Sequence, residues 1–372
     1  LIRHRNDEPA EALAEASIAA IGQLWHPARG WDEASLQAQG LHFQACQSFV
    51  HGEARMLGPL VKLHRATGSS AALRLAEDVA EKLLREVYLE DGAFTAERFG
   101  AVHAHSITCC LSSLAQFADL QDDHALMRRV QAFYDHGLWA MRDTLGWSPE
   151  AVQQTGSDHG EANNTGDIVE TALLLGARGW PAYYHDAERI LRTHLLPSQL
   201  LDTSFVQQPD NPNGVDGLRD VARRHHGAWG FPAPYGHQPA GQGRGNLSFN
   251  MDIVGGVVGS LCAALDAVVA SDDVTHHIRM LLAHETDGVK LEVPYGSCAS
   301  GEVLLITVKR AGALRVQLPP WIDEGQLRID PPGASFLFRD GALHIEQPPV
   351  GTVIRVHFPL PTQELTLTHH HD

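Results

Sequence analysis

The sequence predicts a mainly α-helical protein, with an α/α toroid of helical hairpins over residues 1–272 and a small antiparallel β-sandwich over residues 273–372. Two observations lead to this prediction. In the first part, apolar helical segments alternate with amphipathic ones, as the inner and outer helices of a toroid do. In the second part, short segments of alternating hydrophobicity are separated by Gly and Pro, which is typical of a sandwich.

The most distinctive helix is predicted over residues 162–177. Its apolar side chains between positions 168 and 175 cover nearly the whole circumference, which indicates a buried helix. Acids, amides and a histidine crowd its start, and such groups are costly to bury unless they are paired or face a solvent-filled cavity. The pattern favours a helix whose N-terminal end forms the floor of a pocket; ordinary capping by Asp, Asn and Thr is the alternative.

The same design recurs along the first part of the chain. Each predicted hairpin has an apolar helix with a polar start, then a turn, then an amphipathic helix. The Ala-rich segment from Pro9 to Leu24 is predicted as a further helix, and a partial fourth copy starts at Asn250. The three predicted hairpins span residues 51–88, 103–141 and 162–200.

The N-termini of the inner helices are expected at one end of the ring, because each inner helix is separated from the next by one outer helix that runs back. Helix dipoles favour anionic groups at that end. The long connections 89–102, 142–161 and 201–249 carry many polar residues, and long loops on a rigid scaffold often carry function.

Strands are predicted where the alternating pattern appears after Ser271. The predicted strands lie at 278–282, 289–293, 302–308, 314–318, 326–329, 342–345 and 353–358.

Composition limits the classes of partner. The chain has 372 residues and a formal net charge of −17, which disfavours nucleic acid and acidic membrane surfaces. No apolar run approaches the roughly 20 residues that span a bilayer. We therefore expect neither nucleic acid nor membrane as a partner, and the sequence leaves a homodimer open.

The cysteines and the first residues bear on cofactors and location. The five cysteines are an odd number, unevenly placed and without a CxxC motif, so they predict neither a disulfide framework nor a closed thiolate zinc site. We expect no cofactor and no metal. The first residues read like the end of a helix, so the N-terminus is expected to be incomplete, and a cytoplasmic location is slightly favoured over secretion.

Several motifs between residues 146 and 358 carry a family resemblance. They are GEANNTGD at 160–167, YYHDAER at 183–189, HLLPSQL at 194–200, VKLEVPYG at 289–296, LPPW at 318–321 and FPLP at 358–361. In these motifs the chain resembles the β-L-arabinofuranosidase group of the six-hairpin glycosidase superfamily and its glucuronidase-like relatives. The resemblance implies an α/α toroid followed by a sandwich, and a glycosidase that acts in polysaccharide degradation.

The zinc–thiolate site of the arabinofuranosidases is not matched. In that group a Glu and several cysteines hold a zinc, and one cysteine is the nucleophile. Glu161 stands where the ligand Glu would be, but Asn163 and Phe249-Asn250 stand at cysteine positions. Cys109 and Cys110 are expected to be core thiols. Carboxylates and histidines remain, as in the relatives that act on uronic acid sugars.

Glycoside cleavage needs a proton donor at the leaving oxygen and a second carboxylate for water or the anomeric carbon. Asp158 and Glu161 are the first catalytic candidates, followed by Glu150 and Asp252. Asp167 and Glu170 lie inside the helix, where capping or pairing between helices is the more common role.

Substrate contacts are expected from helix starts and from loop 201–249. Histidines at equivalent hairpin starts favour sugar contacts, although any single one could be a satisfied buried histidine. The loop is expected to cover the helix N-termini and to bring aromatic rings onto a sugar. The predicted binding residues are His51, Glu53, His103, His105, Asn163, Trp229, Tyr235, His237 and Asn250.

The first functional hypothesis is a glycoside hydrolase acting on an oligosaccharide, with uronic-acid-containing oligosaccharides among the candidates. One alternative is a polysaccharide lyase acting on a uronate sugar, with His225, His226, Tyr235 and His237 as candidate base and acid. The other is a carbohydrate-binding protein without catalysis.

Overall fold

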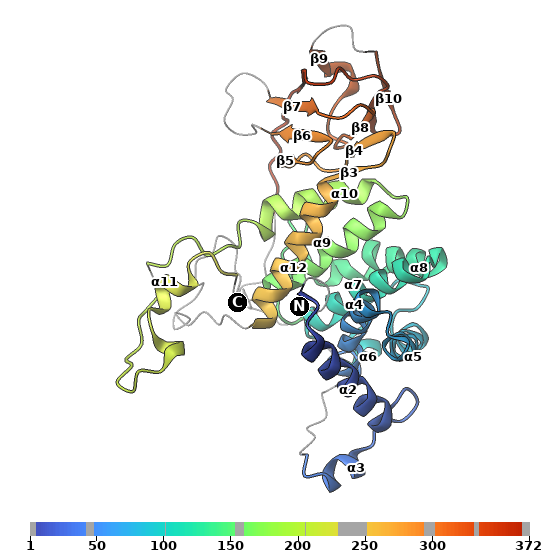
Figure 1. Ribbon diagram of the computed structural model, residues 1–372, viewed down its shortest axis with the longest axis vertical. Coiled ribbons are helices and arrows are strands. Elements are labelled where there is room, and N and C mark those ends of the chain that lie inside the picture. The colour runs from blue at the N-terminus through green and yellow to red at the C-terminus, as the bar shows by residue number, and fades with distance from the viewer. Residues whose placement is uncertain are drawn as a thin grey trace.

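The computed structural model describes residues 5–41, 48–100, 102–152, 160–204, 206–229, 251–293, 302–330 and 335–366, with backbone alone at 251–254, 302 and 303. Figure 1 shows a helical part with two sheets packed at one end of it. Helix α12 (Met251–Val268) leads directly into strand β3 (Val269–Ser271). The predicted fold class, helical hairpins followed by a sandwich, is confirmed, and the division into two domains at residue 272 stays a prediction.

Three helical hairpins precede α12. Glycine or aspartate in a left-handed conformation ends the first helix of two of them, at Gly68 and Asp122, and the next residue caps the returning helix with its side chain. The pairs are α4 (Leu57–Thr67) with α5 (Ser70–Glu86), α7 (Ala104–Gln121) with α8 (His124–Asp135), and α9 (Ala162–Ala177) with α10 (Ala182–Ile190).

The inner helices α4, α7, α9 and α12 run parallel, as their contacts show. His105 and Gln116 near the two ends of α7 meet Glu161 and Glu170, which follow the same order along the chain. Gly166 of α9 likewise lies against Ser260 and Val257 of α12. Helices α7 and α9 are buried on nearly all sides because each lies between two other inner helices and an outer one.

Two outer helices end earlier than expected. The helix predicted to reach residue 141 stops at Asp135, and a 3₁₀ turn (Gly137–Ala140) follows. A Cβ at Gly137 would lie 2.6 Å from the Phe133 ring, so the chain turns here through a close approach that only glycine allows. The helix predicted to reach residue 200 stops at Ile190 and continues as a π-helical turn (Leu191–Leu195).

None of the helices among the described residues has the length and hydropathy of a membrane-spanning segment. Helix α2 and several short elements complete the helical part. They are α2 (Glu8–Leu24), β1 (Trp25–His26), β2 (Gly30–Trp31), α3 (Glu33–Ala38), η1 (Glu53–Met56), α6 (Ala96–Phe99), η4 (Asp216–Leu218) and α11 (Val221–His225).

The sandwich has two five-stranded sheets, ordered β10-β11-β8-β4-β3 and β5-β6-β7-β12-β9. One pair, β4 with β8, is parallel, which corrects the expectation of a purely antiparallel sandwich. The strand expected at 278–282 lies at 275–278, and β3, β5 and β10 were not predicted because they are short. The other bounds are β4 (Thr275–Ile278), β5 (His284–Glu285), β6 (Val289–Glu292), β7 (Glu302–Val308), β8 (Ala313–Gln317), β9 (Arg328–Asp330), β10 (Phe336–Arg339), β11 (Ala342–Ile345) and β12 (Val353–Phe358), with the 3₁₀ turn η6 (Glu324–Gln326) between β8 and β9.

Replacing Gly166 by Ala should destabilise the contact between α9 and α12. A Cβ at Gly166 would lie 2.6 Å from Ser260 Oγ and 3.1 Å from Ser260 Cβ. Overpacking of this kind costs about 1–3 kcal/mol, whereas Ala gains at most about 1 kcal/mol over Gly in a helix. Urea unfolding of Gly166→Ala should therefore show a lower midpoint than the unchanged chain.

Gly259→Ala on α12 is the matched control, since a Cβ at that position meets nothing within 4 Å. This variant should unfold at an equal or higher urea concentration than the unchanged chain. Equal midpoints for the two variants would contradict the close packing of α9 on α12.

Candidate functional site

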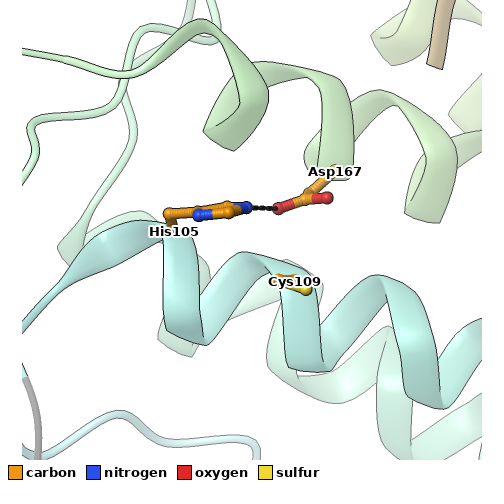
Figure 2. Close-up of side chains that lie close together, drawn as sticks. All are labelled: His105, Cys109 and Asp167. Atoms are coloured by element: carbon orange, nitrogen blue, oxygen red, sulfur yellow. Dashed lines mark ion pairs between the residues drawn. The ribbon is translucent and has the colours of Figure 1, made fainter. Parts of the chain in front are cut away.

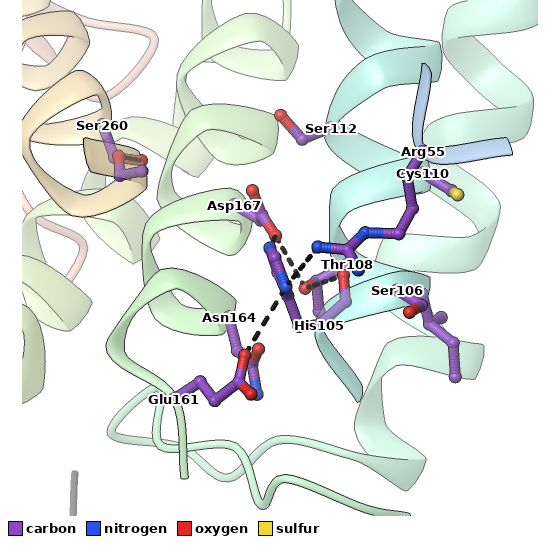
Figure 3. Close-up of polar contacts among 12 residues, drawn as sticks. Arg55, His105, Ser106, Thr108, Cys110, Ser112, Glu161, Asn164, Asp167 and Ser260 are labelled. Atoms are coloured by element: carbon purple, nitrogen blue, oxygen red, sulfur yellow. Dashed lines mark hydrogen bonds and ion pairs between the residues drawn. The ribbon is translucent and has the colours of Figure 1, made fainter. Parts of the chain in front are cut away.

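Two histidines from α7 and one glutamate from α9 meet where these helices begin. His103 precedes the first residue of α7, and Glu161 holds the same position in α9. His103 Nε2 lies 3.5 Å from Glu161 Oε1. His105 Nδ1 lies 3.5 Å from Glu161 Oε2, as Figure 3 shows. The two ring nitrogens thus face the two oxygens of one carboxylate.

The electrostatics of Glu161 follow from these contacts. Burial by itself would raise the pKa of Glu161. Hydrogen bonding to His103 and the charges of His105 and His103 outweigh burial, so the pKa of this carboxyl lies below its ordinary value. Glu161 is therefore held as a carboxylate.

The start of the first hairpin adds two cationic or titratable side chains. The His51 ring stacks on His103 with 4.9 Å between centroids, and an Arg55 guanidinium nitrogen lies 3.1 Å from His105 Nδ1. Burial, and then the charges of His103 and Arg55, lower the pKa of His51. Arg55 was not among the residues predicted from the sequence, and the structure places it against His105.

Glu150 reaches the same group from the loop before α9. The backbone of this loop pairs with the residues that begin α7: the Ala104 N–H donates to the Glu150 carbonyl over 2.8 Å, and Val152 N–H donates to Val102. Side-chain oxygens of Glu150 and Glu161 and a ring nitrogen of His103 all lie within 4.8 Å of one another. The structure therefore brings two carboxyl groups together at the helix starts.

Asp167 lies one to two turns further into α9, facing His105 (Figures 2 and 3). His105 Nε2 lies 3.7 Å from Asp167 Oδ2, and the Thr108 hydroxyl donates to the same oxygen over 2.9 Å. Burial, followed by the negative charge of Glu170, raises the pKa of Asp167 well above its ordinary value. This favours the protonated form of Asp167, in contrast to Glu161.

Glu170 joins three inner helices. It accepts hydrogen bonds from Ser112 and Gln116 of α7 and from Ser260 of α12, at 3.0, 3.2 and 2.8 Å. The prediction that Asp167 and Glu170 pair between helices is confirmed. Asn163, Asp167 and Glu170 are spaced i, i+4 and i+7, so a polar stripe on an apolar helix was the signal in the sequence.

Asn163 is 2% exposed, and both polar atoms of its amide are buried. The amide faces Glu161 and helps to lower the pKa of that carboxyl, but it makes no well-aligned hydrogen bond with the described residues. It lies between Glu161 and α12, where a Cβ at Gly256 would be 3.4 Å from Asn163 Cβ. A buried amide with unmet hydrogen bonds is costly, so this position is suited to a polar ligand.

The remaining predicted site residues lie elsewhere or outside the description. Glu53 begins η1 beside the cluster but forms no ion pair within the described part. Trp229 is a correction: it is 8% exposed and its indole N–H donates to the Leu195 carbonyl over 2.9 Å, so it packs against the π turn instead of offering a stacking surface. Asp158, Tyr235, His237 and Asn250 lie outside the described residues, and of Asp252 only the backbone, in the first turn of α12, is described.

Of the four lyase candidates the structure describes His225 and His226, and neither lies at this cluster. His225 ends the short helix α11 and His226 follows it. Figure 1 shows α11 on an excursion that projects away from the inner helices.

The residues do not fit a zinc–thiolate site. Cys109 lies near His105 and Asp167 (Figure 2), and one ligand atom from each falls within 4.8 Å of the others. Burial and the charge of Asp167 raise the pKa of Cys109 to about 12, and burial raises that of Cys110 well above its ordinary value. Without a metal ion both groups are therefore thiols, with Cys110 buried and Cys109 partly buried. Cys109 is the one sulfur in its group, whereas a zinc–thiolate site uses several. The His103, Glu150 and Glu161 group is a second set with the spacing to hold a divalent cation.

Solved structures show what the chain is similar to, while no protein-family model and no curated protein matches it. A GH127 β-arabinofuranosidase superposes with a TM-score of 0.63 over 96% of this chain and 57% of its own, at 14% identity. A GH127 β-L-arabinofuranosidase from Geobacillus stearothermophilus T6 gives a TM-score of 0.50 over 99% of this chain and 71% of its own, also at 14% identity. The chain thus spans little more than half the length of the first structure. The predicted resemblance to toroid glycosidases is confirmed for the fold.

Cys109 and Cys110 should resist alkylation in the folded protein. A thiol with a pKa of about 12 is ionised in only about one molecule in ten thousand at pH 8, and the thiolate is the reactive form. Peptide mass mapping after iodoacetamide treatment at pH 8 should find Cys262, which is exposed, modified well before the Cys109–Cys110 peptide. Alkylation of Cys109 at the rate of Cys262 would contradict its assignment as a core thiol.

Proposed function

We propose that the chain is a glycoside hydrolase that cleaves an oligosaccharide with Glu150 and Glu161 as its pair of catalytic carboxyl groups. The observation that carries this proposal is their approach: side-chain oxygens of the two lie within 4.8 Å of each other, beside His103. A pair of carboxyl groups across the scissile bond is what most glycoside hydrolases use. The GH127 fold supports the proposal by analogy.

Glu161 takes the role of the ionised carboxylate. His103 and His105 lower its pKa, so it carries negative charge when substrate arrives. In the first step Glu161 attacks the anomeric carbon, the glycosidic bond breaks, and the leaving oxygen takes a proton from Glu150. In the second step Glu150 accepts a proton from water, which attacks the same carbon and releases Glu161 as a carboxylate.

The separation of the carboxyl groups favours this two-step course. Retaining enzymes hold their two carboxyl groups about 5–5.5 Å apart, whereas inverting enzymes need about 6.5–9.5 Å to admit a water. The side-chain oxygens of Glu150 and Glu161 lie within 4.8 Å of each other, which agrees with the spacing in retaining enzymes. The product is therefore expected to keep the anomeric configuration of the substrate.

A uronic-acid-containing oligosaccharide is the finer form of the proposal. Arg55 lies against His105 at the rim of the carboxyl pair, and guanidinium groups bind carboxylates in a bidentate way. The N-terminal ends of α7 and α9 add their positive dipole ends. These groups suit a sugar carboxylate next to the scissile bond.

Glu150→Gln and Glu161→Gln should each lower kcat by at least ~100-fold, the scale for losing a general acid or a catalytic carboxylate. The measurement is the rate of product release from a panel of aryl glycosides and uronate oligosaccharides. The unfolding temperature of each variant checks that it is folded. Glu97→Gln, an exposed acid on α6, is the control and should leave kcat unchanged.

Near-normal turnover in both active-site variants would refute the assignment and move it to Asp158 and Asp252. Release of an unsaturated uronate, detected by its ultraviolet absorbance, would identify a lyase instead. We expect the activity to survive dialysis against a chelator. A loss of activity that zinc or another divalent cation restores would contradict a reaction carried by the carboxyl groups alone.

The acid limb of the pH profile should move when His103 is replaced. Activity needs ionised Glu161 and falls as the pH drops through its pKa, which lies below the ordinary value because of His103 and His105. Removing one of these partners in His103→Ala raises that pKa, so the acid limb of kcat/KM should shift to higher pH. His51→Ala is the control, since His51 touches His103 and is not among the main causes of the lowered pKa of Glu161. An unmoved limb in His103→Ala would count against Glu161 as the titrating group.

A further inference from the structure

A cleft of about 520 Å³ lies between the helical part and the sandwich, at the C-terminal end of α9. Gly176, Ala177 and Tyr184 form its helical wall, and residues of β4 and β8 form the opposite wall. Helix α9 has 16 residues and rises about 1.5 Å per residue, so about 24 Å of helix separates this cleft from Glu161. The cleft is therefore distinct from the carboxyl pair.

The wall of the cleft formed by the sandwich is polar, because alternate residues along a strand point to the same face of the sheet. His277 of β4 and Arg315 of β8 are register partners in the parallel pair. Gln317 follows two residues later on β8, and Arg279 comes directly after β4, so side chains two apart point to the same face. All four residues line the cleft, while Val316 between Arg315 and Gln317 is fully buried.

Two positive charges in this wall have no ionic partner. The side chains of Arg279 and Arg315 form no ion pair and no hydrogen bond with the described residues. Arg279 lies over the Tyr184 ring, 5.4 Å from its centroid. The acid at the rim, Asp340, is exposed and lies 3.4 Å from Arg339 instead. Unpaired guanidinium groups that face a cleft are suited to a carboxylate or a phosphate.

The helical wall offers groups for hydroxyls. Tyr184 is 3% exposed, and its buried hydroxyl has no hydrogen-bond partner in the part of the chain that the structure describes. Gly176 lets the ring lie across α9, because a Cβ there would be 2.9 Å from the ring carbons. The last carbonyls of α9, around Gly176 and Ala177, have no partner within the helix and can accept from hydroxyl groups. An unmet buried hydroxyl at the edge of a cleft points to a ligand that supplies the missing hydrogen bond.

We propose that this cleft binds an anionic carbohydrate. Arg279 and Arg315 hold its carboxylate or phosphate, and Tyr184 and the carbonyls at the end of α9 hydrogen-bond its hydroxyl groups. The volume lies within the about 300–1,000 Å³ of small-molecule sites. This proposal goes beyond hydrolysis, because none of these residues belongs to the carboxyl pair and binding here holds whether or not a bond is cleaved.

Isothermal titration of the full chain tests the proposal with three probes: digalacturonate, glucose 1-phosphate and the neutral disaccharide cellobiose. At least one acidic probe should bind, with cellobiose at least ~10-fold weaker, and the acidic probe that binds identifies carboxylate or phosphate as the source of charge. Arg279→Gln combined with Arg315→Gln should weaken acidic binding at least ~10-fold, the scale for lost charged hydrogen bonds. Tyr184→Phe keeps the ring over Gly176 and should weaken binding several-fold.

Two control variants locate the binding. Arg355→Gln removes the same charge from an exposed position on β12, and Arg55→Gln removes it from the carboxyl pair at the other end of α9. Arg355→Gln should leave the affinity for the acidic probe unchanged. Arg55→Gln should remove at most a separate binding step at the carboxyl pair and leave the binding step in the cleft in place. The proposal is overturned if neither acidic probe binds, if the paired arginine substitutions leave affinity unchanged in a folded protein, or if Arg55→Gln alone abolishes binding.

Discussion

The parallel course of the inner helices is the constraint on which the rest of this structure depends. Since an outer helix returns the chain each time, α7 and α9 begin at the same end and remain in register along their length. Glu161, Asp167 and Glu170 on α9 therefore meet partners on α7 in the same order. The apolar surface around them keeps these contacts away from bulk water, which strengthens each one.

The position of each acid along the contact between α7 and α9 decides the direction of its pKa shift. Glu161, at the helix start, faces two histidines and stays ionised. Asp167, deeper and beside Glu170, has a raised pKa because burial and a like charge both disfavour its ionised form. Acids with opposite pKa shifts a few residues apart are a common feature of sites that move protons. The contact between α7 and α9 thus holds one acid ionised at its start, Glu161, and one acid whose protonated form is favoured further in, Asp167.

Much of this arrangement could be predicted from sequence pattern. Apolar helices with polar starts identified α7 and α9 and placed His103 and Glu161 at their N-terminal ends. Contacts that depend on packing could not be predicted: the backbone pairing that brings Glu150 to α7 joins residues far apart in the chain, with no periodic signal. Trp229 was misplaced because an aromatic residue in a polar loop looks the same whether its indole meets a sugar or the Leu195 carbonyl. The cleft at the end of α9 was missed because His277, Arg279 and Arg315 acquire a common face only when β4 and β8 pair in parallel.

The charge on Glu161 also explains how this toroid differs from a zinc–thiolate site. A glutamate that binds zinc is balanced by the metal, whereas here ring nitrogens of His103 and His105 lie 3.5 Å from the two Glu161 oxygens and lower its pKa. Burial and Asp167 raise the pKa of Cys109, the cysteine nearest the cluster, to about 12, which makes its thiol a poor nucleophile in the absence of a metal. The carboxylate that the histidines keep ionised is the described group best suited to that role. In the proposed mechanism Glu161 acts as the reacting group because its neighbours are imidazoles and an amide, which lower its pKa without a metal.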